Sequence, residues 1–132
     1  MSSLVRYDVV NRVAVITIDN PPVNALSPAV WEGLDEAVAQ AGRDSSVDAA
    51  VVLAAGSTFI AGADIKVFET LRTREQSFER SGRMHALLAR LEDCPKPLVA
   101  AIHGTALGEE HVTQRLRFGR DDAAGEQLAL AA

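Results

Sequence analysis

Two short turns built from small residues carry the chemistry that this sequence could perform. The first, Ala61-Gly62-Ala63-Asp64, follows an apolar, strand-like run that ends at Phe59-Ile60 and precedes a helix-like pattern. The first backbone N–H groups of a helix lack acceptors within the helix, and small side chains let a ligand approach them. The Ala63 N–H is therefore a candidate donor to an oxygen that gains negative charge. Alternatively, Gly62 only permits a tight turn and Asp64 only caps the next helix.

The second turn repeats this pattern in "AAIHGTALGEE", residues 100–110, where an apolar strand leads into Gly108 before a possible helix. Two turns of this kind could direct two N–H donors at one carbonyl oxygen. Acyl-transfer and enolate chemistry requires such a pair of donors. The two turns together therefore predict a site that stabilises an oxyanion.

Acidic and basic side chains beside the second turn are candidates for proton transfer. Glu109 and Glu110 could form an acid/base pair, or they could be solvated charges at a helix start, where negative charge is favourable. His103 could act as a base, but a histidine at a strand end is more often packed beside the core. His85 and His111 have no partners at metal-ligand spacing, so we expect no metal site.

Composition restricts the class of protein. The 132 residues suffice for one domain, the apolar fraction is 48%, and the net charge is −5 with scattered basic residues, which argues against a nucleic-acid partner. Cys94 is the single cysteine, so we expect a structural thiol in a reducing compartment. The N-terminus lacks the apolar core of a signal peptide, and no apolar run is long enough for a membrane span. We therefore expect a cytoplasmic protein.

The elements that must position the two turns follow from local patterns. Residues 4–19 predict a hairpin with its turn at Asn11-Arg12, and the prolines of "NPPVNAL", residues 20–26, then interrupt the strand. Ser27-Pro28 predicts a helix start, and Gly42 lies where a C-cap glycine would end that helix.

Three further elements complete the predicted order. The run 48–56 resembles a strand buried on both faces, and residues 94–104 predict a second apolar strand after a proline break. Between them, residues 73–92 predict an amphipathic helix. Its apolar side contains Phe78, Met84, Leu87, Leu88 and Leu91. We expect one α/β domain.

Three stretches in order, "DNPPVNALS", "FIAGADIKVFE" and "KPLVAAIHGTALG", resemble the N-terminal half of the enoyl-CoA hydratase/isomerase (crotonase) family. The wording "FIAGADIK" is most similar to the hydratase part of bifunctional fatty-acid β-oxidation enzymes. The resemblance extends from about Leu4 to Gly108. It implies an α/β fold of the ClpP/crotonase type, a spiral of strand-strand-helix units that is truncated here. We expect residues 1–108 to form this core and residues 109–132 to form a divergent, helical tail.

The resemblance also implies a site for the CoA thioester of a fatty acid. The Ala63 N–H would be one oxyanion donor, and the turn at Gly108 and Glu109 would supply the other. Loop 24–26 would line the CoA groove through backbone contacts. The implied substrate-binding residues are Asn24, Ala25, Leu26, Ala61, Gly62, Ala63, Asp64, Ile65 and Lys66. No separate cofactor is expected, because coenzyme A is part of the substrate, and family members commonly form homotrimers.

The resemblance fails after Gly108. The family has two glycines, an apolar residue and a catalytic glutamate there, but this chain places Glu109 at the donor glycine and Val112 at the glutamate. The second catalytic glutamate of the hydratases belongs to a later segment without a counterpart here. Thr113-Gln114-Arg115-Leu116 is similar to a stretch much later in the family, which suggests an internal deletion or a shifted reading frame.

Three hypotheses for function follow. The chain could hydrate 2-enoyl-CoA in fatty-acid β-oxidation through an enolate held by the oxyanion donors. It could instead be a non-catalytic module that binds CoA esters, or a non-functional truncated fragment. The absent glutamates favour the second and third hypotheses over full activity.

Overall fold

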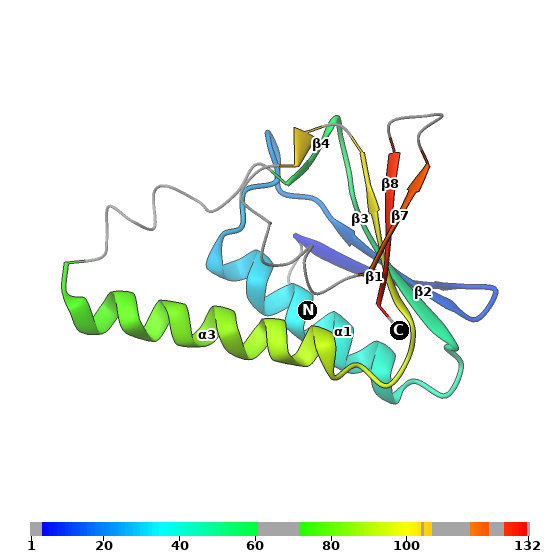
Figure 1. The fold of residues 1–132 in the computed structure, drawn as a ribbon, viewed down its shortest axis with the longest axis horizontal. Helices are drawn as coiled ribbons and strands as arrows, with labels where there is room; N and C mark the ends of the chain where they lie inside the picture. The colour runs from blue at the N-terminus through cyan, green and yellow to red at the C-terminus, as the bar shows by residue number, and fades with distance from the viewer. Residues whose placement is uncertain (1–3, 61–71, 104, 107–116, 122–125, 132) are drawn as a thin grey trace.

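The computed structural model describes residues 4–60, 72–103, 105–106, 117–121 and 126–131, and it shows a mixed sheet with two helices (Figure 1). In chain order, the described elements are β1 (Val5–Val10), β2 (Val13–Ile18), α1 (Pro28–Arg43), β3 (Ala49–Ala54), β4 (Thr58–Ile60), α3 (Arg74–Glu92), β5 (Leu98–Ile102), β6 (Thr105–Ala106), β7 (Arg117–Asp121) and β8 (Glu126–Ala131). The larger sheet has the order β1-β2-β3-β5-β8-β7, and β4 pairs with β6 in a small second sheet.

The predicted hairpin is confirmed as β1 and β2, which pair antiparallel with Val10 opposite Val13. Its turn residues Asn11 and Arg12 have φ values of 50° and 65°. Two successive residues in the left-handed region are what a tight hairpin turn that matches the strand twist requires. Strand β2 then runs parallel to β3, and β3 runs parallel to β5.

Helix α1 begins as predicted, with the Ser27 side chain accepting a hydrogen bond from the Val30 N–H. The predicted glycine C-cap is wrong, because Gly42 lies inside α1, which ends at Arg43. A Cβ on Gly42 would lie 3.3 Å from the Pro95 side chain, so the glycine permits a close approach instead. The end of the helix is capped from a distance, since the Lys96 Nζ donates to the carbonyl oxygens of Ala41 and Asp44.

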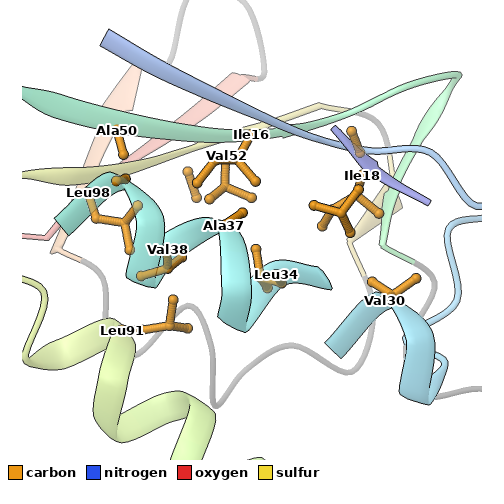
Figure 2. Close-up of a cluster of buried hydrophobic side chains, with 14 of the residues drawn as sticks. Ile16, Ile18, Val30, Leu34, Ala37, Val38, Ala50, Val52, Leu91 and Leu98 are labelled. Atoms are coloured by element: carbon orange, nitrogen blue, oxygen red, sulfur yellow. The ribbon is translucent and has the colours of Figure 1, made fainter. Parts of the chain in front are cut away.

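The core lies between the sheet and α1, with α3 packed beneath α1 (Figure 2). Ile16, Ile18 and Leu98 from the sheet are almost fully buried, and α1 presents Val30 and Val38 to them. The helix predicted at residues 73–92 is confirmed as α3, which begins with a capping box at Thr73.

Two predictions about burial are wrong. Strand β3 is buried on one face, at Ala50, Val52 and Ala54, while the alternate residues are only half-buried. In the described chain both helices lie on the same side of the sheet, so only one face of β3 receives helix packing (Figure 1). Phe78 is not on a buried side of α3, because 80% of it is exposed, whereas Leu87, Leu88 and Leu91 near the helix C-terminus are buried.

The tail also differs from the expectation. Within residues 109–132, which we expected to be helical, the structure has the strands β7 and β8. Strand β8 pairs antiparallel with β5, with Leu98 opposite Ala131. The edge of β5 has backbone groups that need partners, and β8 supplies them. The boundary at residue 108 stays a prediction.

Candidate functional site

The described residues of the predicted site, Asn24, Ala25 and Leu26, belong to a loop that follows the carboxyl end of β2 in the larger sheet. Strands β2, β3 and β5 run parallel, so their carboxyl ends, at Ile18, Ala54 and Ile102, meet at this edge. The loop 19–26, the turn after β3 and the segment that begins with His103 all leave from it. Ligands of open α/β sheets bind outside the carboxyl ends of parallel strands.

Asn24 is buried at the centre of this edge, with 3% of it exposed. Its Nδ2 donates to the carbonyl oxygens of Ala55, at 2.8 Å, and Thr58, at 2.7 Å. Its Oδ1 accepts from the Asn20 N–H at 2.8 Å. The backbone of Asn24 has a φ of 53°, a conformation that asparagine tolerates better than most residues. The Asn24 side chain therefore joins loop 20–26 to the β3–β4 turn.

The other two residues of the predicted CoA-binding loop are anchored through their carbonyl groups. The Ala25 oxygen accepts from the Asn20 Nδ2 at 2.8 Å and from the Ser27 N–H at 2.9 Å. The Leu26 oxygen accepts from the Trp31 indole N–H at 3.0 Å. The Ala25 oxygen thus has both lone pairs engaged. A contact of this loop with CoA stays a prediction.

The strands that lead into the two predicted oxyanion turns are neighbours. Strand β4 pairs parallel with β6, with Thr58 opposite Thr105 and Ile60 opposite Ala106, and an irregularity lies between these pairs. The chain therefore leaves Ile60 and Ala106 from the same end of one small sheet. The predicted residues themselves, Ala61, Gly62, Ala63, Asp64, Ile65, Lys66, Gly108 and Glu109, lie outside the described residues.

His103 follows β5 and contacts the turn between β3 and β4, which Asn24 also contacts. Its Nε2 lies 2.7 Å from the Gly56 carbonyl oxygen. A carbonyl oxygen only accepts hydrogen bonds, so this nitrogen must carry the proton. This contact gives His103 a structural role, while Nδ1 is the nitrogen that keeps a lone pair in the neutral ring. The sequence does not predict this contact. Its one local sign is the glycine at position 56, a residue type common in turns, which has a φ of +80° in the structure.

A groove of about 570 Å³ runs between α1 and α3. Leu26 and Trp31 line it from the side of α1, and Met84 and Leu87 line it from α3. Its rim is charged, with an ion pair between Asp35 of α1 and Arg90 of α3. Leu26 belongs both to the predicted CoA-binding loop and to this groove.

Among the described residues, Tyr7 on the outermost strand β1 has a large pKa change. Burial, together with the hydrogen bond from the Tyr7 hydroxyl to Asp44, raises the pKa of Tyr7 from 10.0 to about 12. Hydrogen bonds from Ser46 hold the pKa of Asp44 below its usual value. Cys94 packs against the core, but it is half-buried, whereas a structural thiol is expected to be buried.

Sequence and structure comparisons agree on the family. Residues 8–112 match the enoyl-CoA hydratase/isomerase family. The chain is 42% identical over 114 residues to a probable enoyl-CoA hydratase of Bacillus subtilis, and the aligned region covers 84% of this chain and 44% of that protein. It is 41% identical over 106 residues to a peroxisomal bifunctional enzyme of Danio rerio, covering 80% of this chain and 14% of that protein.

Solved structures show the same fold. A probable enoyl-CoA hydratase from Mycobacterium thermoresistibile matches with a TM-score of 0.68 and 33% identity, over 76% of this chain and 41% of that one. An enoyl-CoA hydratase/carnithine racemase from Magnetospirillum magneticum matches with a TM-score of 0.72 and 33% identity, over 77% and 39%.

These strand-strand-helix units therefore define an α/β protein of the crotonase fold, of which the chain covers a part. The chain belongs to the enoyl-CoA hydratase/isomerase family, as its three motifs predict. It spans less than half the length of the relatives that it matches. In the described part of the chain, neither helix is long and apolar enough to cross a membrane.

Proposed function

We propose that the chain binds the CoA thioester of a fatty acid at the carboxyl edge of β2, β3 and β5, as a member of the fatty-acid β-oxidation branch of its family. The observation that carries the proposal is the parallel pairing of β4 with β6. This pairing brings together the two strands from which the predicted donor turns depart. Membership of the family and the similarity to peroxisomal β-oxidation enzymes support the choice of substrate.

In the proposed chemistry the thioester oxygen accepts hydrogen bonds from the Ala63 N–H and from a donor near Gly108. Hydration of a 2-enoyl thioester adds a hydroxyl group to C3 while the electrons of the double bond move toward this oxygen. A proton then arrives at C2 and the carbonyl group reforms. Fixed donors lower the energy of the enolate between these two steps.

We propose that this chain is catalytically impaired and acts as a CoA-ester-binding module. Water must lose a proton and C2 must gain one, and in the family glutamates perform these transfers. Glu109 and Val112 occupy the positions where the resemblance places a donor glycine and a glutamate. A carboxylate at Glu109 would repel an oxyanion. A cytoplasmic location is part of the same proposal, and a homotrimer is not, because the family segments that usually make the trimer contacts largely have no counterpart in this sequence.

Calorimetry with free CoA and with butyryl-CoA tests the proposal. Butyryl-CoA has a thioester but no double bond to hydrate, so binding alone is measured. We expect butyryl-CoA to bind more tightly than free CoA, because only the thioester offers an oxygen to the proposed donors. Equal affinity for both compounds, or no binding of either, would contradict the proposal.

A further inference from the structure

The turn between β3 and β4 is held by side chains from two distant parts of the chain. Asn24, from the loop before α1, donates to the carbonyl oxygens of Ala55 and Thr58. His103, from the end of β5, donates to the carbonyl oxygen of Gly56 at 2.7 Å. Three of the four carbonyl groups from residue 55 to residue 58 thus receive hydrogen bonds from these two side chains.

Every polar atom of the Asn24 side chain makes a hydrogen bond in this arrangement. Both N–H groups of its amide have a partner, and its oxygen accepts from the Asn20 N–H. A buried side chain with all its donors satisfied specifies one arrangement, because any displacement leaves polar groups without partners. The β3–β4 turn is therefore fixed to loop 20–26 as well as to β5.

The β3–β4 turn also fixes the position of strand β4. This strand has only three residues, and its partner β6 has two. So short a ladder does little to set its own register. His103 lies two residues before β6 and bonds to a residue two positions before β4. The same contact therefore sets the start of both strands relative to each other.

We propose that Asn24 and His103 are positioning residues for the acyl-CoA site, which fix β4 against β6 and so set the direction in which the chain leaves Ile60. The inference rests on the proposed function, because it is the thioester oxygen that such positioning serves. Neither side chain needs to touch the substrate. Loss of either contact is expected to weaken binding of the thioester group, and loss of the His103 contact is expected to spare binding of the rest of CoA.

The experiment uses a conjugated dienoyl-CoA, whose near-ultraviolet absorption shifts to longer wavelength when donors polarise its carbonyl group. We expect the wild-type chain to produce this shift. His103→Ala should lose most of the shift and weaken dienoyl-CoA binding about threefold to tenfold, the effect of one hydrogen bond. Its affinity for free CoA should stay within about twofold of the wild-type value.

Three further variants make the result specific. His103→Gln retains an N–H that can reach the Gly56 oxygen and should restore the shift. Asn24→Gly keeps a backbone that accepts positive φ while removing the amide, and should lose the shift. His85→Ala, on the exposed side of α3, is the matched histidine control and should behave as wild type. Circular dichroism establishes that each variant is folded.

The outcomes separate the inference from the proposed function. If the wild type binds dienoyl-CoA and His103→Ala gives the same shift and affinity, the positioning role is overturned while the proposed function stands. If the wild-type chain binds no CoA ester, the proposed function fails and the inference with it. Amide hydrogen exchange at residues 55–60 should be faster in His103→Ala than in His85→Ala, and equal exchange would also overturn the inference.

Discussion

At the scale of the residue, side chains far apart in sequence hold both edges of the parallel strands. Asn24 and His103 bind the β3–β4 turn at the carboxyl edge. At the other edge, the Tyr7 hydroxyl donates to Asp44 at 3.0 Å, and Lys96 donates to the end of α1. The contacts of Asn24, His103 and Lys96 give backbone carbonyl groups partners that the loops do not supply.

Tyr7 gives a pH-dependent prediction. Its pKa is about 12 in the folded chain against an ordinary value of 10.0, so the folded state favours the neutral phenol. The resulting stabilisation is fully present below pH 10 and is lost as the pH rises through 12. Tyr7→Phe has no phenol to ionise. We therefore expect the stability advantage of wild type over Tyr7→Phe, measured by urea unfolding, to be smaller at high pH than at neutral pH. An advantage that stays constant up to pH 12 would contradict the assignment.

Short motifs predict where the candidate site lies, and for Ala63 and Gly108, which are outside the described residues, this stays a prediction. The contacts of the described residues Asn24 and His103 could not be predicted. The motifs predict turns at Ala63 and Gly108 because small residues between a strand and a helix permit tight turns. The role of Asn24 depends on partners 31 and 34 residues away, and that of His103 on a partner 47 residues away. No local pattern specifies such pairs.

At the scale of the element, local signals predict where segments begin, and packing decides which faces they bury. Asn11-Arg12 and Ser27-Pro28 mark the hairpin and α1 because turns and caps depend on adjacent residues. The half-buried face of β3 and the pairing of β8 with β5 depend on distant segments. Leucine and alanine alternate along the sequence of β8, which can form a strand because the edge of β5 offers it a pairing partner.

One leucine and one phenylalanine of α3, each replaced by alanine, test which side of the helix is buried. Leu91 is 3% exposed in the core, whereas Phe78 is 80% exposed near the other end of the helix. Leu91→Ala should lower the free energy of unfolding by about 2–5 kcal/mol, because it leaves a cavity. Phe78→Ala should change it by no more than about 0.5 kcal/mol. Thermal or urea unfolding measures both, and similar losses for the two variants would contradict the observed orientation of α3.

At the scale of the whole molecule, the chain is a crotonase-fold protein that spans less than half the length of its relatives. Its described part contains the sheet edge, the loop 20–26 and the paired strands β4 and β6. We propose that these elements bind a thioester. The proton transfers of hydration need further groups, and we propose that this chain lacks them, because Glu109 and Val112 stand where the resemblance places a glycine and a glutamate.

We accordingly expect little or no hydration of crotonyl-CoA by residues 1–132. Loss of general acid–base assistance typically costs about 10²–10⁴ in rate. Loss of one oxyanion donor costs about 10²–10³, although the two effects need not multiply. The loss of absorbance of the enoyl thioester measures the rate. Rapid turnover that Glu109→Gln or Glu110→Gln abolishes would contradict this expectation and would make those glutamates the catalytic pair.

The most direct test of the central claim compares two substitutions of Ala63 by calorimetry with butyryl-CoA. The claim is that Ala63 acts through its backbone N–H, which Ala63→Ser keeps and Ala63→Pro removes. We predict that Ala63→Ser binds butyryl-CoA nearly as tightly as the wild type and that Ala63→Pro binds it more weakly, with free CoA as the reference for each. Equal affinity of the two variants for butyryl-CoA would contradict the claim that this N–H holds the thioester oxygen.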